Sequence, residues 1–149
     1  ARARELLALV GLERFADKRP SELSGGMRQR ASLCRSIVHR PEVLIMDEPF
    51  GALDAFTRED LWQLMHRLRA EEPFTGLLIT HDLRESVYLA DEIIVLSDRP
   101  ARAQYRVRID VPAPRPISML YEPAQVATLA TLRDQIEIAQ GRMPAAGEH

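Results

Sequence analysis

Two adjacent carboxylates, Asp47 and Glu48, follow a short apolar run at residues 43–46 that lies between Pro41 and Pro49. Neighbouring side chains diverge at the end of a strand, so one carboxylate can hold a metal ion while the other orients a water molecule. Phosphoryl transfer needs both functions. Pro49 restricts the residue before it, which predicts an extended backbone at Glu48. Because acidic residues are common at strand ends, this pair alone does not define a catalytic site.

The tripeptide Ser24-Gly25-Gly26 stands where a helix is predicted to begin and to run over residues 26–39. The first amides of a helix have no partner within it and the helix dipole is positive there. Ser24 and the two glycine N–H groups could therefore bind a phosphate. Taken alone, the same tripeptide is also a good helix cap and nothing more. Neighbouring motifs must decide between these two interpretations.

His81 follows a second apolar run, residues 77–80, much as Asp47 and Glu48 follow the first. In an open α/β sheet, ligands bind beyond the carboxyl ends of the strands, so both strand ends are predicted to face one crevice. A lone histidine at such a turn is more often a structural hydrogen-bonding group than a catalytic one. The functional hypothesis therefore depends on the combination of residues.

Three apolar runs alternate with amphipathic segments, which favours a layered α/β fold with a mostly parallel sheet. The predicted strands are residues 43–46, 77–80 and 93–96, and the predicted helices lie near 26–39, 61–68 and 82–90. Asp82, with Glu85 three residues later, supplies a capping signal for the last of these helices. Residues 104–110 alternate apolar and arginine side chains, as in an edge or antiparallel strand. A final amphipathic helix is predicted after Pro123.

The composition excludes several classes of protein. With 20 basic and 22 acidic residues among 149, the formal charge is −2, which argues against general electrostatic capture of nucleic acid. No apolar run approaches the roughly 20 residues that span a bilayer, so any membrane association is expected to be peripheral. Cys34 is the only cysteine, which excludes an internal disulfide and a multi-cysteine metal site. Its place on an apolar helix face predicts a core residue in a reducing compartment.

The order and spacing of these motifs resemble the ATP-binding-cassette family of transport ATPases. Residues 23–29 resemble the family's signature motif, 43–47 its Walker B strand, Glu48 its catalytic carboxylate, 51–54 its D-loop and His81 its switch histidine. Five motifs in the right order within about sixty residues make a specific match. Residues 47–54 and 91–100 are most similar to importers of nitrate, sulfonate, taurine and related anions.

The resemblance implies a P-loop NTPase-like fold, ATP and Mg²⁺ as ligands, and two cassettes arranged head to tail. The residues that would contact nucleotide across this pair, or link its two sites, are Ser24, Gly25, Gly26, Gln29 and Asp54. In the same subunit, Asp47 would hold Mg²⁺, Glu48 would polarise the attacking water and His81 would touch the γ-phosphate. The implied partners are a second ATPase subunit, transmembrane permease subunits and, indirectly, a solute-binding protein, with no nucleic acid. The expected location is peripheral, at the cytoplasmic face of the plasma membrane.

One expected motif does not occur in the sequence. A P-loop requires Gly-x-x-x-x-Gly-Lys-Ser/Thr, and the only lysine, Lys18, lies between Asp17 and Arg19. We therefore expect the C-terminal part of a cassette in residues 1–111, with a helical signature subdomain at 1–40 and the Walker B to switch-histidine core at 41–111. Residues 112–149 are expected to form a proline-rich connector, a helix and a frayed tail. Such a chain should neither bind ATP tightly nor hydrolyse it, and its sheet should have an exposed edge.

Two alternatives remain at this stage. A non-transport cassette ATPase of DNA repair or translation is one, although residues 50–52 and the short spacing from Asp54 to His81 favour transport. The other is a non-enzymatic half-cassette that contributes Ser24-Gly25-Gly26 to a partner as a regulator or decoy. The presence of Asp47, Glu48 and His81, which are useful only within their own subunit, argues against that interpretation.

Overall fold

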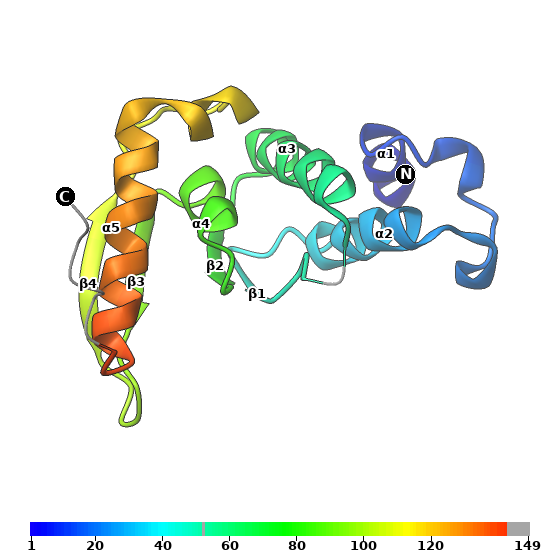
Figure 1. Cartoon of the computed structure of the whole chain (residues 1–149). Coiled ribbons are helices and arrows are strands. Elements are labelled where there is room, and N and C mark those ends of the chain that lie inside the picture. Colours follow the sequence, from blue (N-terminus) through cyan, green and yellow to red (C-terminus); the bar gives the residue numbers. More distant parts are fainter. Residues whose placement is uncertain (52, 143–149) are drawn as a thin grey trace. The chain divides into compact units, whose positions relative to one another are not determined.

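The computed structural model describes residues 1–51 and 53–142 (Figure 1). The chain forms two compact units, Ala1–Ile79 and Thr80–His149, each of which is described by itself. Ala52 of the predicted D-loop and most of the predicted tail, residues 143–149, lie outside the described residues. The predicted boundaries near residues 40 and 111 follow motifs rather than compactness, and they stay predictions.

The first unit is mainly helical. Its elements are α1 (Arg2–Leu9), short 3-10 helices at Glu13–Phe15 and Pro20–Glu22, α2 (Gly25–Ile37), β1 (Val43–Asp47), α3 (Ala55–Glu71) and β2 (Thr75–Ile79). The core is built around α3, whose buried face carries Leu61, Trp62, Leu64 and Leu68. The helix predicted around 61–68 is therefore confirmed, and it begins earlier because Asp54 caps it.

β1 and β2 pair in parallel, from Val43 opposite Thr75 to Asp47 opposite Ile79. The exposed large apolar side chains on this pair are Val43 at 58%, Ile45 at 66%, Leu77 at 54% and Ile79 at 50%. A wholly apolar run predicts burial on both faces, and for β1 this is wrong: Leu44 is buried whereas Val43 and Ile45 are not. The reason is that no described segment of the first unit covers that side of the pair.

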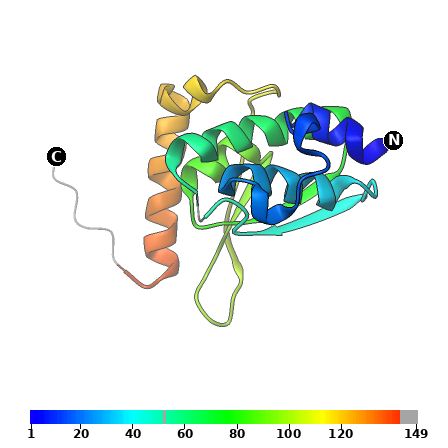
Figure 2. The same cartoon turned by 90° about the vertical axis from the view of Figure 1, so that its right-hand side faces the viewer.

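The second unit is built around a hairpin and a long helix. Its elements are α4 (Leu83–Leu89), β3 (Glu92–Leu96), β4 (Ala103–Arg108), a 3-10 helix at Ile117–Tyr121 and α5 (Pro123–Ala139). β3 and β4 pair antiparallel, and α5 runs alongside them (Figures 1 and 2). The antiparallel strand predicted at 104–110 is confirmed. The 3-10 helix was not predicted, because the proline-rich connector has no helical periodicity.

The strands of the described chain form two separate pairs. β1 and β2 have the predicted parallel arrangement, whereas the predicted third strand, β3, pairs with β4 instead of extending that sheet. The apolar side chains of the second unit that are almost fully buried come from α4, the 3-10 helix and α5. They include Val87, Tyr88, Met119, Leu120 and Leu132. Among the described residues, no helix has both the length and the apolarity that a membrane span requires.

Candidate functional site

The glycine-led start of α2 is capped by Ser24. Its Oγ accepts a hydrogen bond from the Met27 amide at 3.3 Å, and its backbone is extended, at φ −65° and ψ 166°. The helix-cap interpretation of Ser24 is therefore confirmed. Ser24 and Gly25 are exposed. The expectation that this turn also contacts a phosphate stays a prediction.

The two glycines of this turn differ in what surrounds them. A Cβ added at Gly26 would lie 3.3 Å from Cγ2 of Thr57, so a side chain there would crowd the first turn of α3. A Cβ added at Gly25 would meet nothing within 4 Å in the described chain. Packing within this chain thus explains the glycine at position 26 and leaves the one at position 25 unexplained. Glycine is also used where a ligand approaches the backbone closely.

Gln29, half-buried on α2, donates a hydrogen bond from its side-chain amide to the carbonyl oxygen of Pro49. This contact ties the signature helix to the loop that directly follows Glu48. Sequence reasoning placed Gln29 with the nucleotide-contacting residues and missed this link, which no spacing rule indicates. The contact with nucleotide stays a prediction.

Asp47 and Glu48 lie at the exposed end of β1. The Glu48 amide donates to the Ile79 carbonyl at 2.8 Å, which continues the pairing with β2 beyond the strand. Glu48 has φ +46°, in the left-handed region, so the predicted extended conformation is wrong. The physical reason is a tight turn: the Gly51 amide donates to the Glu48 carbonyl at 3.3 Å, and the next residue but one, Phe50, is fully buried. The turn outweighs the local preference imposed by Pro49.

Asp54, the last residue of the predicted D-loop, is the N-cap of α3. Its Oδ1 accepts a hydrogen bond from the Thr57 amide at 3.0 Å. The pKa of the Asp54 carboxyl is lowered below its ordinary value of 3.8, most of all by a hydrogen bond from the Thr57 side chain and, to a smaller extent, by the one from the Thr57 backbone. The loop is also held by Arg58, which donates to the Leu53 carbonyl at 2.9 Å. The role of Asp54 in linking two nucleotide sites stays a prediction.

His81 is exposed and belongs to the second unit, two residues beyond the end of β2. Asp82, which follows it, caps α4 by accepting hydrogen bonds from the amides of Arg84 at 2.9 Å and Glu85 at 3.2 Å. The helix start predicted from Asp82 and Glu85 is confirmed. The other candidate residues, from Ser24 to Asp54, all lie in the first unit. The crevice predicted between the two strand ends therefore stays a prediction.

Metal binding would depend on few protein ligands. Over the described ranges 1–51 and 53–142, no group of three or more His, Cys, Asp and Glu side chains is placed to hold a metal ion. Magnesium sites at nucleotides commonly use one or two carboxylates together with substrate phosphates and water. The exposed carboxylate of Asp47 fits a site of that kind.

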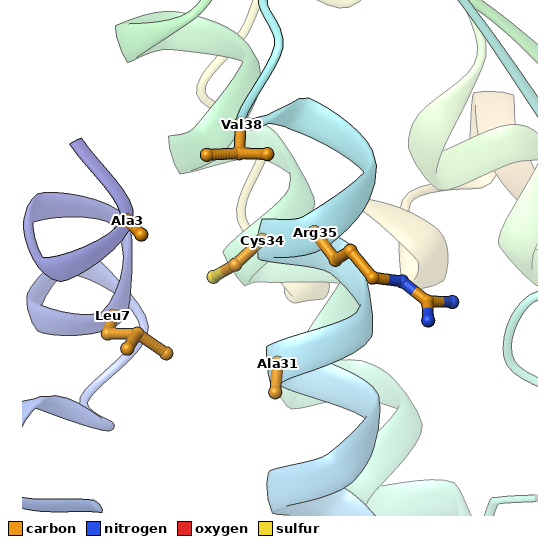
Figure 3. A pocket seen from close by; sticks show the side chains of 6 residues that line it. All are labelled: Ala3, Leu7, Ala31, Cys34, Arg35 and Val38. Carbon is orange, nitrogen blue, oxygen red and sulfur yellow. The ribbon is translucent and has the colours of Figure 1, made fainter. Parts of the chain in front are cut away.

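A pocket of about 240 Å³ lies between α1 and α2 (Figure 3). Its lining residues are Ala3, Leu7, Ala31, Cys34, Arg35 and Val38, and none is a predicted site residue. Cys34 points toward α1, whereas the guanidinium of Arg35 points away from it. Burial raises the pKa of the Cys34 thiol to about 11, so the thiol stays protonated at neutral pH. The prediction that Cys34 is a core residue is confirmed.

Comparisons with known proteins identify ATP-binding subunits of ABC transporters as relatives. The sequence profile of the ABC transporter family matches residues 1–51. The chain is 47% identical over 115 residues to the aliphatic sulfonates import ATP-binding protein SsuB 1 of Xanthomonas axonopodis pv. citri (strain 306), covering 77% of this chain and 46% of that protein. It is 48% identical over 110 residues to the taurine import ATP-binding protein TauB of Pseudomonas entomophila (strain L48), covering 74% and 42%.

Among solved structures, the chain matches the dimeric structure of MJ0796, a bacterial ABC transporter cassette, with a TM-score of 0.58 and 34% sequence identity. The match covers 74% of this chain and 47% of the MJ0796 chain. The fold is thus that of part of an ATP-binding cassette, in the α/β class with the P-loop NTPase fold. The chain belongs to the ABC transporter family of ATPases. It spans less than half the length of the curated relatives it matches. The predicted fold class and the family resemblance are confirmed.

Proposed function

We propose that this chain supplies the signature and water-activating residues of an ABC importer ATPase, which couples ATP hydrolysis to uptake of a small solute such as a sulfonate, taurine or nitrate. The observation that carries the proposal is the exposed end of β1, where Asp47 and Glu48 leave a parallel strand pair in a tight turn. The names of the sulfonate and taurine relatives support the class of solute. They also favour transport over DNA repair or translation.

Each candidate residue has a defined part in hydrolysis of the β–γ phosphate bond. Asp47 would hold Mg²⁺, which supplies charge neutralisation at the phosphates when it is bound. The Glu48 carboxylate would accept a hydrogen bond from the attacking water and so orient it. His81 would donate a hydrogen bond to the γ-phosphate and stabilise the charge that develops there. Both Glu48 and His81 are exposed, as residues that meet a substrate must be.

The second nucleotide contact would come from a second copy. The amides of Gly25 and Gly26 at the N-terminus of the 13-residue helix α2 suit a phosphate, and Gly25 has open space where a side chain would stand. In a head-to-tail pair these amides, with Ser24 and Gln29, would face nucleotide on the opposite subunit, and Asp54 would link the two sites. The further partners would be permease subunits and, through them, a solute-binding protein. The subunit would then lie at the cytoplasmic face of the membrane.

The 149 residues contain no P-loop sequence, so we propose that they do not turn over ATP by themselves. The half-cassette alternative would use only Ser24 to Gly26, in a complex with an intact partner. The intact mass of the protein in its source cells separates the two. A mass well above 16.9 kDa supports the ATPase subunit, whereas a mass of 16.9 kDa supports the regulator or decoy.

A chimera tests the hydrolytic role. The part of the Xanthomonas sulfonate protein that precedes the region matched by this chain is joined ahead of residue 1, and Mg²⁺-dependent release of phosphate is measured. We expect Glu48→Gln to lower kcat by about 10²–10⁴-fold, because a neutral amide polarises the attacking water much less than a carboxylate does. Glu71→Gln, which makes the same change at the exposed end of α3, is the matched control and should keep full activity. Full turnover in Glu48→Gln would contradict the proposal.

A further inference from the structure

Arg115 joins the proline-rich connector to the C-terminal end of α4. Its side chain is 2% exposed, and Nη1 donates to the carbonyl oxygens of Tyr88 at 2.9 Å and Ala90 at 2.7 Å. The last carbonyls of a helix have no partner within the helix and carry its negative dipole end. A buried guanidinium at this place therefore donates hydrogen bonds to these carbonyls, and its positive charge is stabilised by the negative end of the helix dipole.

The remaining contacts of Arg115 fix it in one orientation. Nε donates to the Val111 carbonyl at 2.7 Å, and Nη2 lies 3.1 Å from Oδ1 of Asp91. In the other direction, the Tyr88 hydroxyl donates to the Arg115 carbonyl at 2.6 Å. The planar fork of arginine reaches all these acceptors at once, which a lysine ammonium on a flexible stem cannot do.

The same segment also contacts the first turn of α4. Arg84 donates to the Tyr121 hydroxyl at 3.2 Å, and its guanidinium carbon lies 5.8 Å from the centre of the Tyr121 ring. We call Arg115 and Tyr121 the α4 clamp. The clamp holds the seven-residue helix α4 at both ends, within the second unit.

His81 is connected directly to the start of α4. Asp82, its neighbour, caps the helix with its side chain, and the Asp82 amide donates to Oγ1 of Thr80 at 3.0 Å. His81 thus lies between two residues that hydrogen-bond each other. Its backbone must follow any displacement of the first turn of α4.

We propose that Arg115 is a positioning residue for His81: through the α4 clamp, the C-terminal segment sets the place of the helix that begins just after this histidine. The contribution of His81 to hydrolysis rests on the proposed function. The positioning itself does not, because every contact involved lies within residues 80–121. The connector would then be a working part of the ATPase rather than a passive extension.

The test uses the isotope-labelled 149-residue chain and nuclear magnetic resonance. Arg115→Lys keeps the charge and removes the fork, and Arg133→Lys makes the same change at an exposed site on α5 as the matched control. We expect Arg115→Lys to speed exchange of the Ser86 and Ala90 amides at least tenfold and to displace the imidazole and amide signals of His81. Arg133→Lys should change neither.

Unchanged His81 signals in a folded Arg115→Lys chain would overturn the proposal, even if the chain were less stable, because a merely structural role predicts that outcome. If Arg115→Lys does not fold, Tyr88→Phe removes the single hydroxyl bond to Arg115. It should displace the His81 signals in the same direction by a smaller amount, and no displacement would overturn the proposal.

In the chimera, Arg115→Lys should lower kcat and leave KM unchanged. An inactive chimera would count against the proposed function alone, since the resonance experiment involves no nucleotide.

Discussion

The two strand pairs of this chain manage their apolar faces in different ways. β1–β2 exposes the aliphatic side chains of Val43, Ile45, Leu77 and Ile79 on one face, which we call the aliphatic face, and which also carries Thr75 and Asp47. β3–β4 is covered by α5, and on its outer side Ile94 lies opposite an arginine, Arg106. Parallel strands are normally buried on both faces, whereas an antiparallel pair needs cover on one face only. The second unit therefore covers one face of its own strand pair with α5, whereas the aliphatic face of the first unit's pair stays exposed.

The candidate catalytic residues follow this division. Asp47 and Glu48 lie at the end of the pair with the aliphatic face, and His81 is the second residue of the unit whose sheet has its own cover. The α4 clamp adds further contacts that lie wholly within the second unit. The strand pair that bears the carboxylates leaves its aliphatic face exposed.

Leu132→Ala should have the largest effect on stability. Leu132 is fully buried on the helix that covers β3–β4, so its truncation removes apolar contacts and leaves a cavity. We expect the unfolding free energy of the second unit to fall by about 2–5 kcal/mol, measured from exchange of the β3 and β4 amides. Leu132→Met, which nearly conserves volume, should cost less than about 1.5 kcal/mol. A loss from Leu132→Ala within the range of Leu132→Met would show that α5 does not close this core.

We expect copies of this chain to associate through the aliphatic face, and Ile45→Glu should weaken that association at least tenfold. An aliphatic face of this kind promotes pairing between copies, and a charge at its centre would be buried without a partner in such a complex. Sedimentation velocity over a range of concentrations measures the effect. Ile138→Glu, at an exposed position on α5, is the control and should leave association unchanged. Equal weakening by both variants would mean that the aliphatic face is not where the copies meet.

Glu48→Gly should stabilise the first unit by about 1 kcal/mol, because glycine adopts a left-handed backbone without the steric cost that glutamate bears at φ +46°. Unfolding in urea can be followed through Trp62, the only tryptophan, which is buried on α3. Glu48→Ala keeps the steric cost and should give no comparable gain. If glycine and alanine have the same effect, the left-handed turn is not a source of strain.

The smallest effect concerns acid stability of the first unit. Because the folded-state pKa of Asp54 is lowered, its carboxylate stabilises the fold above the ordinary value of 3.8, and this contribution is lost as the pH falls through the folded value. Asp54→Asn keeps a cap and cannot titrate. We expect the variant to lose less stability than the wild type between pH 5 and pH 2, followed by Trp62 fluorescence. Identical losses would remove Asp54 from the acid response.

The sequence alone was sufficient to predict the structure of segments whose conformation depends on their own residues. Ser24 and Asp82 cap helices as their residue types predict, and the apolar run after Pro41 is a strand. The sequence alone was insufficient where contacts outside the segment determine the backbone conformation. The left-handed turn at Glu48 is imposed by the buried Phe50 and the Gly51 hydrogen bond, against the preference that Pro49 imposes on its neighbour.

Tertiary contacts account for the other differences. Arg115 lies between two prolines in a segment without periodicity, so its burial and its contacts with α4 leave no sequence signal. The Gln29 contact with Pro49 is of the same kind. The pairing of β3 with β4 depends on a hairpin that the pattern of arginines only partly indicated, because alternation predicts an antiparallel strand without naming its partner.

We propose that this chain carries the water-activating carboxylate of an ABC ATPase, Glu48, although its sequence contains no P-loop to cradle the phosphates. The most direct test is ATP turnover by the purified 149-residue chain beside its Glu48→Gln variant, with Mg²⁺ present. Our account predicts equal, background rates for the two proteins. Turnover by the chain alone that disappears in Glu48→Gln would contradict it.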